Sequence, residues 1–415
     1  MLGSLGGIGR VLAQTWPALL AWYLGGELVR ASVLALAAPI GADSALAALL
    51  LVPIAVLARL VSYVGMFLAL RRALPAYRDL AEGQVTFTGW RDAAREFTTI
   101  LLASIGPFFT LYALLGLVSK DLSDYARAAY LYTMSEKTIL NVGDGPLVLA
   151  VVVVAFGGRM AIKYFGSKLP EWTGLVSIYL DATWVFVALT GLSALFGPVI
   201  EWIQNRQVVH WVEQSREFLR GVWAPIRSVI DGIDWLTPVA VQLVLLPLAW
   251  LLIAGVIYTR ALGNAVEERS EPGPVAALLR SRIQKLPKLL RRRARLYEEE
   301  WQGTASPLLL AGRMILGAGW IRLAVVVAVY GLLFALSQWA LRGLFFAVGP
   351  HEARFWFTAD GIVSLVGSAV FEPVRVVLLA VVFDLCLRRW QDRRLQSAAL
   401  SASAPAEPAP NPASR

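Results

Sequence analysis

The chain has 415 residues, of which 57% are hydrophobic and only 16% are charged, and its formal net charge is +9. The mean hydropathy of +0.62 excludes an ordinary soluble domain, because this chain could bury so much apolar surface only if lipid covered much of it. A nucleic-acid partner is not indicated, since the cations cluster beside apolar segments and no RNA- or DNA-binding motif occurs.

Apolar segments long enough to cross a bilayer recur along the chain and predict an all-α, polytopic helical bundle. The first segment contains Glu27 and Arg30, which argue against a cleavable signal peptide. The second contains Pro53 as a predicted kink and Arg59 near its middle. We predict one membrane domain, residues 1–396, with eight spans at about 16–40, 45–70, 97–118, 146–162, 174–196, 239–258, 321–348 and 361–387.

Residues 201–236 lie between the fifth and sixth predicted spans and are too charged to cross a membrane. Their apolar residues repeat at offsets of three and four, which indicates an amphipathic helix, and Pro225 divides the stretch into two helices. We predict that this pair lies on the outer membrane surface or caps the bundle, and that it could also bind a protein partner or a second copy of the chain. The apolar face contains Trp211, Phe218, Val222, Trp223 and Ile226.

A basic cytoplasmic loop, residues 260–305, follows the sixth span and sets the predicted orientation. Arg and Lys beside membrane spans stay on the cytoplasmic side, and ten of them fall between residues 260 and 295. Segments 71–95, 159–168 and 388–415 hold five, three and five more, so both ends of the chain are predicted to be cytoplasmic. The predicted surface for anionic lipid headgroups contains Arg280, Arg282, Lys285, Lys288, Arg291, Arg292, Arg293 and Arg295.

The cationic residues comprise 32 Arg and 6 Lys, which together with abundant Ala, Gly and Leu is typical of a GC-rich bacterial genome. We therefore expect a multi-pass protein of the bacterial plasma membrane, whose main partner is the lipid bilayer. The tail from residue 397 to 415 is rich in Ala, Ser and Pro, and this composition predicts a disordered cytoplasmic tail.

Charged residues fall inside the predicted spans, where each isolated charge costs roughly 3 kcal/mol or more. Glu27 with Arg30, and Glu372 with Arg375, stand three positions apart and can pair on one helical face. Two interpretations stay open, namely a polar route or substrate site through the bundle, and neutral pairs that hold helices in register. The predicted intramembrane cluster consists of Glu27, Arg30, Arg59, Asp181, Glu372 and Arg375.

Catalytic motifs are missing from the sequence, which has no Walker A, G-x-S-x-G, kinase or dinucleotide-binding pattern. His210 and His351 are the two histidines, and their separation fits no metal-site spacing. Acids of the outer segment 120–145 could act as bases or metal ligands in an enzyme that acts on a lipid, but a solvated, charged loop is the favoured interpretation. These acids are Asp121, Asp124, Glu136 and Asp144. We expect no catalytic residue, no metal and no cofactor.

Three functions remain open from the sequence. The favoured one is a non-enzymatic protein that handles or conducts an ion, small solute or lipid through its charged interior. The second is a scaffold or subunit of an envelope complex, and the third is a membrane-embedded enzyme acting on an envelope lipid. A sealed core would favour the scaffold. A cavity that reaches Arg59 and Glu372 and opens sideways would favour a lipid carrier or a lipid enzyme.

Overall fold

The computed structural model describes residues 2–81, 89–133, 145–165, 173–204, 241–263 and 308–403, together with 211, 227–228 and 231–232. Nearly all of these residues are helical and no strand occurs among them. The all-α prediction is therefore confirmed for the described part of the chain.

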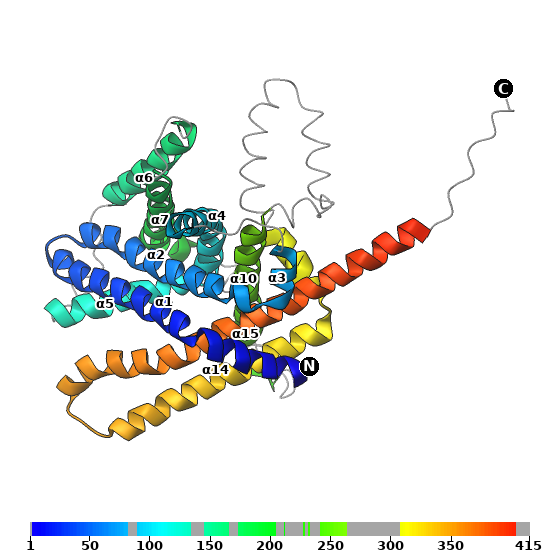
Figure 1. The fold of residues 1–415 in the computed structure, drawn as a ribbon. Coiled ribbons are helices and arrows are strands. Elements are labelled where there is room, and N and C mark those ends of the chain that lie inside the picture. The colour runs from blue at the N-terminus through cyan, green and yellow to red at the C-terminus, as the bar shows by residue number, and fades with distance from the viewer. Residues whose placement is uncertain are drawn as a thin grey trace, which may run out of the picture.

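The first two helices, α1 (Leu2–Asp43) and α2 (Ala45–Leu70), form a hairpin (Figure 1). Ser44 separates them, and its hydroxyl accepts the backbone N–H of Ala47, which satisfies one of the free donors at the start of α2. The bounds of α2 coincide with the second predicted span. This hairpin fixes the relative positions of Glu27 and Arg30 on α1 and Arg59 on α2.

Small residues allow α1 and α2 to approach closely. Gly26 on α1 faces Ser62 on α2, and Gly65 on α2 faces the ring of Trp22, so that a methyl group at either glycine would overlap the facing side chain. The Ser62 hydroxyl also donates to the backbone oxygen of Trp22 at 2.7 Å. Such close packing and interhelical hydrogen bonding are what holds helices together in lipid, where apolar burial between helices contributes little.

The middle of the chain contains α4 (Trp90–Leu114), α5 (Leu117–Thr133), α6 (Gly145–Phe165) and α7 (Thr173–Gln204). The turn between α4 and α5 uses Gly116 with a φ of +71°, a conformation that favours glycine because it lacks a Cβ. α5 packs along α1, α4 packs against α10, and α6 packs mainly on α7. The tight turn therefore returns the chain from α4 towards the hairpin of α1 and α2.

The second half begins with the π-helical turn η3 (Val241–Leu245), which continues into α10 (Leu246–Leu262). A short apolar helix, Leu308–Gly317, precedes a second hairpin made of α14 (Trp320–Val348) and α15 (Ala353–Ser403). In Figure 1 this hairpin lies along one side of the molecule, and the end of α15 projects beyond the other helices.

The core is formed mainly by α2, α10 and α15. Tyr258 of α10 shows how they interlock, since its hydroxyl donates to the Phe67 backbone oxygen at 2.9 Å and its ring stacks on Phe383. The 3-10 turn η1 (Arg71–Ala73) and the short helix α3 (Pro75–Ala81) follow α2. The carboxylate of Asp384 on α15 accepts the backbone N–H of Tyr77 at 3.0 Å and so caps the first turn of α3.

Five described helices are long and apolar enough to cross a membrane, which indicates a membrane location. They are Gly7–Asp43, Ala45–Ala73, Trp90–Ala113, Leu243–Leu262 and Trp320–Val348. The predicted fourth and fifth spans contain the shorter apolar helices Leu149–Ile162 and Thr173–Ala188, and the predicted eighth span lies within α15. The number of eight spans and the orientation stay predictions.

Several predicted features lie outside the described residues. The basic loop, with all eight of its predicted lipid-binding residues, is one of them. In the outer pair, Trp211 is described and exposed, whereas Phe218, Val222, Trp223 and Ile226 are not described. α15 continues to Ser403, so its last seven residues belong to the stretch for which disorder is predicted.

Candidate functional site

A cavity of about 500 Å³ lies between the two hairpins and receives side chains from α1, α2, α4, α5, α10, α14 and α15. It combines charged and hydroxyl groups with apolar surface, as small-molecule sites commonly do. The charged and phenolic lining residues are Tyr23, Glu27, Arg59, Tyr63, Tyr112, Lys120, Tyr330, Glu372 and Arg375. Four of the six predicted intramembrane charges therefore line one cavity, although they come from helices far apart in the sequence.

The first ion-pair network joins α1, α2 and α5. The carboxylate of Glu27 lies 3.3 Å from Arg30 Nη1 and 3.5 Å from Arg59 Nε, so it contacts both arginines. Asp121 on α5 accepts from both of the same arginines, at 3.2 Å from Arg30 Nη2 and 2.7 Å from Arg59 Nη1. Asp124, one turn further along α5, forms an ion pair with Arg30. The local pair Glu27–Arg30 is thus present as predicted, within a larger network.

Asp121 is the most deeply buried member of this network, with 1% of its surface exposed. Tyr112 on α4 supports it, because the phenolic hydroxyl donates to Asp121 Oδ2 at 2.5 Å and accepts from Arg59 Nη1 at 3.0 Å. The prediction that Asp121 and Asp124 belong to a solvated loop is wrong. They lie on a helix whose buried stripe is Val118, Asp121, Tyr125 and Ala129.

The second network joins α2, α10 and α15. Glu372 Oε2 lies 2.5 Å from Arg375 Nη2, which is the local pairing that the three-residue spacing predicts. Tyr63 on α2 bridges the pair, since its hydroxyl donates to Glu372 at 3.0 Å and accepts from Arg375 at 2.8 Å. The Arg375 guanidinium lies 4.4 Å from the centroid of the Trp250 ring, a cation–π arrangement that holds the guanidinium in place.

Asp181 does not belong to either network. It lies on α7 and forms an ion pair with Arg159 on α6, and neither residue lines the cavity. Arg159 and Asp181 each lie within the apolar part of their helix, and their pairing satisfies both charges across the helix–helix contact. The six predicted charges are therefore divided between the cavity region and a separate interhelical pair.

Sequence reasoning missed Tyr63, Tyr112, Trp250 and Asp121 as parts of the site. Only Asp121 left a readable signal, because the residues at offsets of three, four and four from Val118 to Ala129 form one helical stripe. The three aromatic residues sit within uniformly apolar segments, where nothing in the spacing distinguishes a residue that contacts a charge from one that packs in the core.

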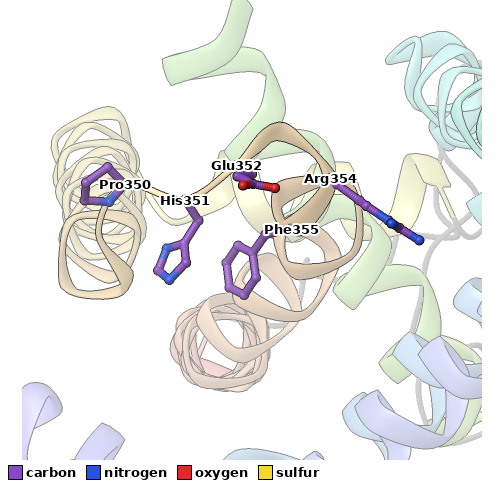
Figure 2. A pocket seen from close by; sticks show the side chains of 5 residues that line it. All are labelled: Pro350, His351, Glu352, Arg354 and Phe355. Carbon is purple, nitrogen blue, oxygen red and sulfur yellow. The ribbon is translucent and has the colours of Figure 1, made fainter.

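Another hollow lies on the turn between α14 and α15, lined by Pro350, His351, Glu352, Arg354 and Phe355 (Figure 2). The His351 ring stacks on Phe355 with centroids 4.2 Å apart, whereas Arg354 points away from both. The five residues are close neighbours in sequence and His351 is exposed. This hollow is a feature of one exposed turn and does not gather groups from several helices.

Comparisons with protein-family models, with curated proteins and with solved structures give no match to this chain. The membrane location indicated by the long apolar helices and the geometry of the charged cavity are the two observations that bear on function.

Proposed function

We propose that this protein is a multi-pass protein of the bacterial plasma membrane that binds an ion, small solute or lipid in the charged cavity and handles it without chemical change. The observation that carries the proposal is that both ion-pair networks, through Arg59 and through Glu372 and Arg375, line one cavity. Ion pairs that only held helices in register would be strongest if they were sealed from solvent, because water in a cavity screens the attraction between the two charges.

The chemistry of the lining supports binding rather than catalysis. Arginine stays protonated at physiological pH and serves as a hydrogen-bond donor, not as a base. Four outer acids were the candidates for an enzyme acting on lipid. Of these, Asp121 and Asp124 are engaged by Arg30, and Glu136 and Asp144 lie outside the described residues. The arrangement therefore favours a carrier or conductor over a lipid enzyme.

The test is whether a polar reagent reaches the cavity. Ser364 lines the cavity, whereas Thr183 on α7 is buried elsewhere. In a Cys386→Ser background, Ser364→Cys should react with a small cationic thiosulfonate in purified, detergent-solubilised protein, and Thr183→Cys should not. Equal protection of both cysteines would show a sealed interior and would overturn the proposal.

The cytoplasmic location of both ends is part of the proposal, and the cation counts support it. Single cysteines at Ser281 and Gln391 should be shielded from an impermeant thiol reagent in intact cells, whereas one at Ser215 should be labelled. Labelling at Ser281 from outside would reverse the orientation.

A further inference from the structure

Cationic groups in the cavity lining keep hydrogen-bond donors that their neighbours do not use. Arg59 engages its neighbours through Nε and Nη1, so its Nη2 has no hydrogen-bond partner within the described ranges. This atom is not among the buried polar atoms without a partner, so it remains accessible. Arg375 contacts Glu372 and Tyr63 through Nη2 and also shares a hydrogen bond with Tyr330. Lys120 also lines the cavity, and no ion pair involves it in the part of the chain that the structure describes.

The carboxylates of the lining are largely occupied. Both oxygens of Glu27 face arginines, and Glu372 Oε2 contacts Arg375 and Tyr63. Glu372 Oε1 alone has no partner among the described residues, and it can accept a hydrogen bond from a hydroxyl group. Among the charged groups of the lining, Arg59 and Lys120 keep free donors and only one carboxylate oxygen stays free, which favours a ligand that is anionic and rich in acceptors.

The cavity is bounded on one side by α14, whose main neighbours are α15, η3 and α10. Phe334 lines the cavity and is also 40% exposed, so α14 forms part of an opening at the molecular surface. The opposite face of α14 presents the exposed apolar residues Leu332, Leu336 and Trp339. In a membrane, hydrocarbon chains would cover these exposed sides of α14, and the opening beside Phe334 would lead sideways from the cavity into the bilayer.

We propose that the cavity binds an anionic, phosphate-bearing lipid taken sideways from the bilayer. The phosphate is held by Lys120 and Arg59 beside the positive charge of Arg375, a headgroup hydroxyl donates to Glu372, and the chains leave along α14. The inference rests on the proposed binding function of the cavity and names its ligand class. A volume of about 500 Å³ suits a headgroup and the first part of a chain, so most of the hydrocarbon stays in the bilayer.

The test measures equilibrium binding to the purified full chain in a non-ionic detergent by native mass spectrometry. The probes are phosphatidylglycerol, phosphatidylcholine and glycerol 3-phosphate, which separate an anionic lipid from a zwitterionic lipid and from a soluble phosphate. Lys120→Gln should weaken phosphatidylglycerol binding about tenfold. The control is Arg127→Gln, which removes the same charge from an exposed position of α5 outside the cavity and should leave binding unchanged.

A second pair of variants tests the cavity itself. Ser364→Phe fills the lining and should abolish binding of phosphatidylglycerol, whereas Ile362→Phe, at an exposed position of α15 outside the lining, should not. Preference for phosphatidylglycerol over the other two probes, together with these variant effects, supports the inference.

The outcomes that overturn the inference differ from the one that also overturns the proposed function. Equal binding of phosphatidylcholine, or a loss of binding in Arg127→Gln as large as in Lys120→Gln, would mean that the cavity does not discriminate between lipids by headgroup charge. Glycerol 3-phosphate binding as tightly as the lipid would make the ligand a soluble anion and leave the binding function intact. Failure of all three probes, with the cysteine at Ser364 also unreactive, would overturn both.

Discussion

Replacing Glu372 or Arg375 alone should destabilise the protein more than replacing both. Each residue is the other's charged partner at 2.5 Å, and Tyr63 is neutral, so a single change to Gln leaves one charge without compensation. The double change leaves none. The variants are Glu372→Gln, Arg375→Gln and their combination.

The magnitude follows from the exposure of the pair. Removing one partner of a fully buried ion pair costs about 3–5 kcal/mol. The side chains of Glu372 and Arg375 are 22% and 18% exposed and line a cavity, so solvent screens the remaining charge and reduces that cost. We expect a loss of about 2 kcal/mol in the free energy of unfolding for each single variant. For the double variant, which leaves no uncompensated charge, we expect a loss of about 1 kcal/mol or less, instead of the sum of about 4 kcal/mol.

The assay is detergent-phase unfolding of the purified full chain, titrated with sodium dodecyl sulfate and followed by circular dichroism. Arg127 and Asp360 provide the control, because they form an exposed interhelical pair at 2.7 Å. Arg127→Gln and Asp360→Asn should each cost less than about 0.5 kcal/mol. Single variants at Glu372 and Arg375 as stable as the parent would show that both charges are fully solvated. A double variant whose loss equals the sum would show that the two residues do not interact.

Three further predictions use the same unfolding measurement. Tyr112→Phe should cost about 2 kcal/mol, because the hydroxyl hydrogen-bonds to Asp121 and Arg59, whereas Tyr125→Phe removes a buried hydroxyl that has no partner among the described residues and should cost nothing; the reverse order would refute the network. Gly26→Ala should destabilise by about 2 kcal/mol through overlap with α2, whereas Gly25→Ala, which meets open space, should be neutral or stabilising by up to about 1 kcal/mol. Asp384→Ala should remove the cap of α3, with a loss of about 1 kcal/mol and faster hydrogen exchange in that helix; unchanged exchange would contradict the capping role.

The local features of this protein could be predicted well from the sequence. The second helix has the predicted bounds of 45 and 70, and the Glu-x-x-Arg spacing places acid and base on one helical face in both α1 and α15. These features depend only on helical periodicity and on residues within a few positions of each other.

Contacts between distant helices could not be predicted in the same way. Tyr63 and Glu372 are 309 positions apart, and Arg30 and Asp121 are 91 apart, yet each pair shares a hydrogen bond. Asp121 was misplaced because a charged segment was taken as solvated, whereas the tertiary structure supplies two arginines and a tyrosine that satisfy its carboxylate. A polar residue is buried only when its partners surround it, and that depends on the packing of several helices.

The sequence by itself determined that this chain is helical, that it is apolar enough for a membrane, and that acid and base stand in pairs within its apolar segments. Composition and periodicity suffice for these conclusions because each helix satisfies its own backbone hydrogen bonds. Only the tertiary structure decided that Arg59, Glu372 and Arg375 share one cavity and that Asp181 lies apart with Arg159. The reason is that the residues surrounding a charge on one helix belong to the neighbouring helices. Close packing determines which helices are neighbours, and short-range sequence patterns do not encode that packing.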